Sequence, residues 1–135
     1  MIVACRLAFA LIALCIAPPL LAAPLYVNPL DAKLQKYIDV GNRKLPTMVT
    51  SAMRQEKVTV ANGVLTYSYT VVTRTAAQLA SSNISATQRA AILPATCAAP
   101  DTSRMLKDGI SFRYVYYGSD GAVAGQVAII PSDCR

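Results

Sequence analysis

The dipeptide Asn62-Gly63 most constrains how this chain can fold. A two-residue type I′ turn needs positive φ at both positions, and Asn followed by Gly adopts that conformation at little cost. Val- and Thr-rich segments with alternating polar and apolar residues precede and follow the pair. The sequence therefore predicts a β-hairpin, with one strand inside Met48–Val60 and the other over Val64–Val72.

A second hairpin is predicted near the C-terminus. Its strands are Ile110–Tyr117 and Ala122–Ile130, and the turn between them is Gly118–Gly121. Alternation assigns one side of the strands to the core: Leu65, Tyr67, Tyr69, Val71, Ile110, Phe112, Tyr114, Tyr116, Val123, Val127 and Ile129. The other side forms a flat, polar open face with few charges: Thr66, Ser68, Thr70, Ser111, Arg113, Val115, Tyr117, Ala124, Gln126 and Ala128.

Helical spacing of apolar residues marks the segment before the first hairpin. The apolar positions are Leu30, Leu34, Tyr37 and Ile38. This period predicts an amphipathic helix over Leu30–Val40, which Gly41-Asn42 ends.

Further helical segments are predicted between the two hairpins. Ser85 and Gln88 have the spacing of a capping box and begin a helix over Ser85–Leu93, which Pro94 limits; a resumed helical turn over Ala95–Ala98 stays open. Asp101–Asp108 is typical of another helical turn and is followed by Gly109. The element order α-β-β-α-β-β predicts an α+β fold, with a four-stranded antiparallel sheet and helices on one face.

The N-terminus has the pattern of an export signal. Arg6 precedes an apolar run over residues 7–17, and small residues follow Pro18-Pro19. The run is shorter than the ~20 residues that span a bilayer, so cleavage is favoured over a retained anchor. Release after Ala22 would leave residues 23–135 as a single periplasmic or secreted domain without stable membrane insertion. Release after Ala23 is the alternative.

Four cysteines are present, and two of them lie in the predicted signal. Removal of Cys5 and Cys15 leaves Cys97 and Cys134 as the only pair in an oxidising compartment. These two residues are predicted to form one disulfide.

Catalytic and metal-binding patterns are scarce. The chain has no histidine, which excludes Ser-His and Cys-His nucleophile systems and histidine metal sites. The seven acidic residues fall at no spacing that local structure turns into a carboxylate pair, although a glycosidase dyad assembled by the fold stays open. The sequence predicts no enzyme activity, no cofactor and no metal.

Tyrosines and basic residues offer two further interpretations. The tyrosines could form a platform on which bases or sugars stack. However, four of them fall on the predicted core face of the sheet, which favours a role in packing the core. Without Arg6, twelve basic and seven acidic residues remain, and the basic residues are scattered. The predicted export of the protein and the scattered positions of its basic residues both argue against a nucleic-acid partner.

A set of residues across the predicted domain resembles a known group of proteins. They are Leu45-Pro46, Tyr67-x-Tyr69, Cys97, Gly109, Tyr114-x-Tyr116, Asp120-Gly121 and Asp133-Cys134. In these positions the chain is similar to small secreted proteins of unassigned function from Gram-negative bacteria. The resemblance implies a periplasmic α+β domain held by a disulfide, and it implies no active site.

A small exported domain without catalytic motifs is expected to bind another protein of the cell envelope. The leading hypothesis is an immunity protein or inhibitor of a toxin or cell-wall hydrolase. The alternative is an accessory subunit of an envelope secretion or pilus system. The open face, an edge strand or the two turns are the candidate interfaces. The predicted partner-binding residues are Thr70, Arg113, Tyr117 and Gln126.

Overall fold

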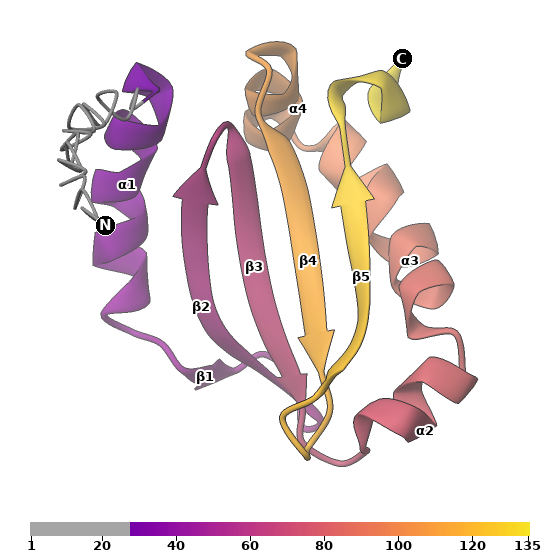
Figure 1. Cartoon of the computed structure of the whole chain (residues 1–135). Coiled ribbons are helices and arrows are strands. Elements are labelled where there is room, and N and C mark those ends of the chain that lie inside the picture. The colour runs from indigo at the N-terminus through magenta and orange to yellow at the C-terminus, as the bar shows by residue number, and fades with distance from the viewer. Residues whose placement is uncertain (1–27) are drawn as a thin grey trace, which may run out of the picture.

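The computed structural model describes residues 28–135 (Figure 1). The predicted export signal, residues 1–22, and both of its proposed cleavage sites lie outside this range. The described elements, in chain order, are α1 (Pro29–Asn42), β1 (Thr47–Met48), β2 (Met53–Ala61), β3 (Val64–Val71), α2 (Ala76–Ser81), α3 (Ile84–Ala98), α4 (Pro100–Lys107), β4 (Ser111–Tyr117), β5 (Val123–Ile129) and the 3₁₀ turn η1 (Pro131–Cys134).

The sheet has five strands in the order β1-β2-β3-β4-β5. Neighbouring strands are antiparallel except β3 and β4, which are parallel. The α+β class is confirmed, whereas the prediction of four wholly antiparallel strands is wrong. The chain leaves the end of β3 and returns through α2, α3 and α4 to the level where β3 began, so β4 must run in the same direction as β3 (Figure 1).

The Asn62-Gly63 turn is confirmed. Both residues have positive φ, 53° and 74°, and Ala61 pairs with Val64 directly beside the turn. The second hairpin, β4–β5, also forms between the predicted segments.

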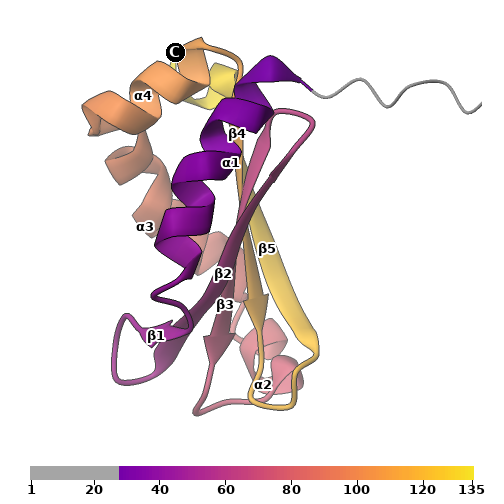
Figure 2. The same cartoon turned by 90° about the vertical axis from the view of Figure 1, so that its left-hand side faces the viewer.

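The helices lie on one side of the sheet (Figure 2). On this side α1 packs along β2, and α2 and α3 pack along β5. The core lies between them and the strands, and its buried residues are Ile38, Leu65, Val71, Leu79, Ile84, Leu106, Ile110, Phe112, Tyr116, Val127 and Ile129. The buried core residues that lie in the predicted strands all belong to the face that alternation assigned to the core.

The start of β5 departs from the predicted alternation. A register shift pairs Tyr116 with Gly125 but Tyr117 with Val123. The extra residue turns Val123 to the open face, where it is 62% exposed, and Ala124 packs against the core instead. Both residues were predicted on the opposite sides.

Helix α1 follows the predicted stripe with one exception. Leu30, Leu34 and Ile38 face the core, but Tyr37 is 71% exposed. Tyr37 is at the margin of the apolar stripe, about 100° round the helix from Ile38.

The capping box predicted for α3 is wrong. The residue before the helix, Asn83, has φ 51° and no side-chain capping bond. Ser85 instead contacts β5, where its Oγ accepts a hydrogen bond from the N–H of Gln126 at 3.1 Å. A capping box does form at the start of α2, between Thr75 and Gln78.

Pro94 does not limit the helix at Leu93, and the helical structure over Ala95–Ala98 that the sequence left open does form. α3 continues to Ala98 with Pro94 inside it. Proline removes one N–H from the helix, which leaves the carbonyl of Ala90 without its partner. Ala90 and Pro94 are both exposed, so water can bind that carbonyl.

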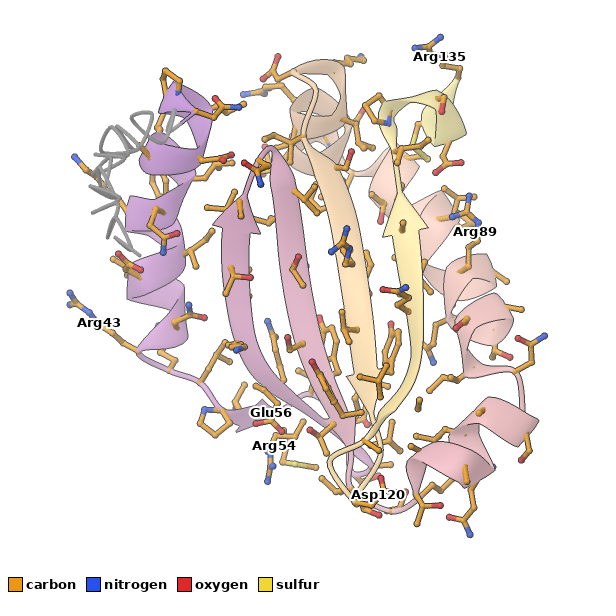
Figure 3. The ribbon with its side chains drawn as sticks, viewed as in Figure 1. Arg43, Arg54, Glu56, Arg89, Asp120 and Arg135 are labelled. Atoms are coloured by element: carbon orange, nitrogen blue, oxygen red, sulfur yellow. A yellow bond between two sulfur atoms is a disulfide. The ribbon has the colours of Figure 1, made fainter. Side chains whose placement is uncertain are left out.

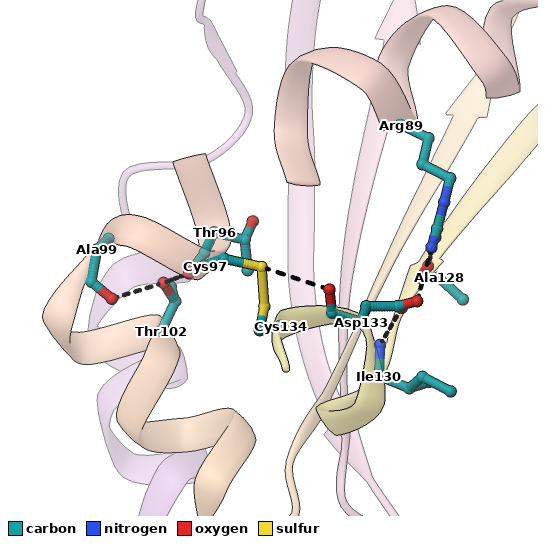
Figure 4. Close-up of a disulfide and its surroundings, with 9 residues drawn as sticks. All are labelled: Arg89, Thr96, Cys97, Ala99, Thr102, Ala128, Ile130, Asp133 and Cys134. Atoms are coloured by element: carbon teal, nitrogen blue, oxygen red, sulfur yellow. Dashed lines mark hydrogen bonds and ion pairs between the residues drawn. A yellow bond between two sulfur atoms is a disulfide. The ribbon is translucent and has the colours of Figure 1, made fainter. Parts of the chain in front are cut away.

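The predicted disulfide is confirmed (Figure 4). Cys97 in α3 and Cys134 in η1 are joined, with their Cα atoms 5.3 Å apart. Beside it Arg89 donates from Nη2 to Asp133 Oδ1 at 2.8 Å, and Ile130 N–H donates to Asp133 Oδ2 at 2.9 Å. The C-terminal turn is thereby fixed to α3.

Candidate functional site

The open face carries all of the predicted partner-binding residues. Thr70 pairs with Tyr117 across the parallel β3–β4 contact, Arg113 lies further along β4, and Gln126 is opposite Val115. No described helix covers this side of the sheet (Figure 2). The structure therefore brings Thr70, Arg113, Tyr117 and Gln126 onto one face, where Arg113 and Gln126 are exposed and Thr70 and Tyr117 are half-buried. Their role in binding stays a prediction.

An ion pair that sequence reasoning missed borders this face. Arg54 Nε donates to Glu56 Oε1 at 2.8 Å, and Figure 3 labels both near the start of β2. The Thr70 hydroxyl lowers the pKa of the Glu56 carboxyl most strongly and Arg54 adds to this effect, while desolvation opposes it. Arg54 and Glu56 are two residues apart on β2, a spacing that alternation places on one face of a strand, and the register shifts between Gln55 and Lys57.

Side chains bind the backbone of β2 beyond its pairing with the short β1, and the backbone of the edge strand β5. At β2, Asn42 Nδ2 donates to the carbonyl of Val58 at 2.8 Å and Oδ1 accepts the Val58 N–H at 2.9 Å. At β5, Ser85 accepts the N–H of Gln126 and Arg89 donates to the carbonyl of Ala128. These bonds use backbone groups that an added strand would need, which argues against the edge-strand interface.

The two turns are also tied to helices. Gly63 N–H donates to Asp31 Oδ1 at 3.0 Å, and Ala76 N–H at the start of α2 donates to Asp120 Oδ1 at 3.1 Å. Asp120 thus holds the β4–β5 turn against α2, at the position labelled in Figure 3. Fixed turns of this kind are less suited to adapt to a partner than the faces of the sheet.

The helical side contains an apolar groove between α1 and α4. Its volume is about 340 Å³. We call it the tyrosine groove, and its lining residues are Leu34, Tyr37, Ile38, Gly41, Asn42, Leu45, Gln55, Val58, Leu65, Tyr67 and Met105. Of these, Asn42, Gln55 and the two tyrosines supply polar atoms, so the groove offers apolar contact with a few oriented hydrogen-bonding groups.

Stacked tyrosines form the floor of this side. Tyr67 lies on Tyr114 with ring centroids 5.2 Å apart, and Tyr69 lies on Tyr116 at 5.7 Å. Burial raises the pKa of Tyr67 to about 12 and also raises the pKa of Tyr116. The hydroxyl of Tyr116 donates to Gln88 Oε1 at 3.4 Å, which links this ring to α3.

The sequence indicated the tyrosines but not the groove. Alternation placed all four rings in the core, and only Tyr116 is fully buried at 1% exposure. Tyr67 is half-buried because α1 packs along β2 and α3 packs along β5, which leaves the middle of the sheet partly uncovered. The Tyr-x-Tyr pattern in two neighbouring strands was the only signal of this floor.

Residues 28–135 contain neither a cluster of metal ligands nor a membrane-spanning helix. No group of three or more Cys, Asp or Glu side chains there is arranged to hold a metal ion. Likewise, no helix in that range combines the length and apolar character needed to cross a bilayer.

Comparison with known proteins gives matches at the level of structure. No protein-family model matches the chain, and no curated protein matches it. A crystal structure of a protein described as secreted, from Pseudomonas aeruginosa, is similar with a TM-score of 0.67 and 16% identity, over 78% of this chain and 93% of that one.

Two further structures are pilotins of type II secretion systems. EpsS from Vibrio vulnificus has a TM-score of 0.60 and 13% identity, over 78% of this chain and 92% of its own. AspS from Vibrio cholerae has a TM-score of 0.52 and 16% identity, over 78% and 92%. At these identities the comparisons show that the fold is shared.

Proposed function

We propose that this protein is a non-catalytic accessory component of an envelope secretion system, and that it binds its protein partner in the tyrosine groove. The apolar groove over Tyr67 carries this proposal. Its apolar lining comes from α1, from Met105 of α4 and from the strands β2 and β3. Such a lining takes up apolar side chains of a partner segment, and it lacks paired acidic or nucleophilic groups for catalysis.

The shared fold supports the choice of partner class. Two of the three similar structures are named as pilotins of type II secretion systems, and none of the three is named as an inhibitor. The comparisons thus favour the secretion-system alternative over the immunity protein that the sequence favoured. An envelope or secreted location follows from this proposal and agrees with the predicted export signal.

Gly41 allows a sharp test of the groove. It lines the groove, and a Cβ built on it meets no atom within 4 Å. A Gly41→Leu variant should therefore fill the groove without disturbing the core, and Gly41→Ala is the matched control because it removes glycine but adds one carbon only.

The measurement is cross-linking in the producing cells followed by mass spectrometry. A photoreactive residue at Gln55, inside the groove, should capture a secretion-system component in the parent and in Gly41→Ala. Gly41→Leu should lose most of this capture while its melting temperature stays at or above that of the parent. Equal capture by both variants would exclude the groove as the binding site.

The open face is tested in the same experiment. A photoreactive residue at Gln126 reports on the surface formed by Thr70, Arg113 and Tyr117. Capture there and not at Gln55 would move the interface to the open face. Capture of a toxin or a cell-wall hydrolase at either position would return the inhibitor hypothesis to first place.

A further inference from the structure

A basic and apolar stripe runs along the outer surface of α1. Lys33, Tyr37, Val40 and Lys44 follow one another at intervals of four, three and four residues, which places them on one side of a helix. The helical turn continues beyond Asn42, because Lys44 N–H donates to the carbonyl of Gly41 at 3.1 Å. Lys36 and Arg43 flank the stripe.

The residues of the stripe are exposed, although Tyr37 also lines the tyrosine groove. Tyr37 is 71% exposed and Val40 is 58% exposed. The four basic residues are exposed as well, and Figure 3 shows Arg43 directed outward from the end of α1. We call the set of Lys33, Lys36, Tyr37, Val40, Arg43 and Lys44 the α1 stripe.

The positive charge of this surface is only partly offset: Asp39, which is exposed, lies three residues from Lys36 and four residues from Arg43 on the same flank of the helix. Within residues 28–135 the ion pairs are Arg54–Glu56 and Arg89–Asp133, and neither involves α1. The acidic residue nearest in sequence, Asp39, accepts a hydrogen bond from Gln35 at 2.7 Å on the flank of the helix. The stripe therefore presents four cations beside two exposed apolar side chains.

We propose that the α1 stripe binds the surface of membranes that contain anionic lipids. Exposed tyrosine and valine among basic residues are typical of a helix that lies in the bilayer interface, where lysine stems reach the headgroups and the ring enters the acyl boundary. Helix α1 lies at one margin of the described fold (Figure 1), so its outer side can approach an extended bilayer surface.

Vesicle sedimentation with the protein purified from the producing cells tests this proposal. The probe is vesicles of equal parts phosphatidylethanolamine and phosphatidylglycerol, compared with vesicles of phosphatidylcholine alone. A basic residue near an anionic surface contributes about fivefold to partitioning, so Lys33→Gln, Lys36→Gln and Lys44→Gln together should weaken binding by about a hundredfold.

A second triple variant controls for net charge. Lys57→Gln, Arg104→Gln and Lys107→Gln remove the same charge from exposed positions outside α1. This variant should keep vesicle binding within a few-fold of the parent. All substituted side chains are exposed, so both variants should unfold at the temperature of the parent. Equal losses of binding in the two variants would show attraction by net charge and would overturn the proposal.

Because the chain has no tryptophan, a single introduced tryptophan can report by its fluorescence which surface contacts the vesicle. Val40→Trp places a single tryptophan in the stripe, and Val123→Trp places one on the open face at a similar exposure of 62%. With anionic vesicles, the emission of Val40→Trp should shift to shorter wavelength and become protected from acrylamide. Val123→Trp should show neither change.

Other outcomes contradict a lipid site. No sedimentation with anionic vesicles would exclude it. Sedimentation in which Val123→Trp alone becomes protected would place the contact on the open face. Loss of protein cross-linking in the lysine variant without any vesicle binding would assign the α1 stripe to a protein partner. Because the stripe variants leave the groove unchanged, these results are distinguishable from failure of the proposed function.

Discussion

The side-chain amide of Asn42 forms two hydrogen bonds with the backbone of Val58, one to its carbonyl and one from its N–H. This contact imitates the pairing of a neighbouring strand at the edge of β2. At the other end of α1, Asp31 accepts the N–H of Gly63. The two contacts fix α1 along β2, and with it the wall of the tyrosine groove.

Asn42→Ala should destabilise the protein by about 1 to 3 kcal/mol, because both Val58 backbone groups lose their partner at a half-buried edge. Urea unfolding measures this change. The neighbouring exposed residue provides the control, and Arg43→Ala should leave the unfolding midpoint nearly unchanged. An Asn42→Ala variant as stable as the parent would show that water replaces the amide at no cost.

Gly118→Ala should be among the most damaging single substitutions. A Cβ at this position would lie 2.1 Å from the backbone nitrogen of Ala76 and 2.6 Å from the carbonyl carbon of Thr75. Forcing the β4–β5 turn away from α2 should cost about 3 kcal/mol. Gly41→Ala, which meets no atom, should instead raise stability by about 0.5 kcal/mol in thermal unfolding.

Two adjacent tyrosines test which side of β4 is the core. Tyr116 is 1% exposed, and Tyr116→Ala should cost roughly 3 to 5 kcal/mol because it empties a buried site. Tyr117 lies on the open face, so Tyr117→Ala should cost less than about 1 kcal/mol. Comparable losses in calorimetric unfolding would mean that the open face is covered in solution.

Alkaline pH should destabilise the fold through the tyrosines. Burial raises the pKa of Tyr67 to about 12 and raises the pKa of Tyr69, Tyr114 and Tyr116 from the ordinary value of 10.0. The folded state therefore holds protons that the unfolded chain releases above pH 10.0, so stability is complete below that pH and falls as pH rises toward 12. Tyrosinate absorbance, recorded together with circular dichroism, should show these residues ionising as the protein unfolds.

Reduction of the disulfide should lower stability by about 3 to 4 kcal/mol, since Cys97 and Cys134 close a loop of 37 residues. The variant with Cys97→Ser and Cys134→Ser should reproduce the melting temperature of the reduced parent. A reductant that leaves the melting temperature unchanged would contradict the stabilising role of this bond.

Prediction from the sequence succeeded where a structure depends on near neighbours. The Asn62-Gly63 turn follows from the φ angles that these two residues accept. Prediction failed where a residue distant in sequence changes the contacts that a side chain or strand makes. Ser85 binds Gln126 on β5 instead of capping α3, and a register shift at Tyr116 turns Val123 outward. The groove was missed because alternation shows which side of a strand faces the helices, but not how much of it they cover.

The sequence by itself determined the two hairpins, the helix over Leu30–Val40, the core face of the strands and the pairing of Cys97 with Cys134. These depend on side-chain periodicity, turn chemistry and the number of cysteines. Only the tertiary structure decided that β3 and β4 are parallel, that Asn42 and Ser85 bind the backbone of β2 and β5, and that a groove remains over Tyr67. These features depend on where the helices pack, which is set by contacts between residues far apart in the chain.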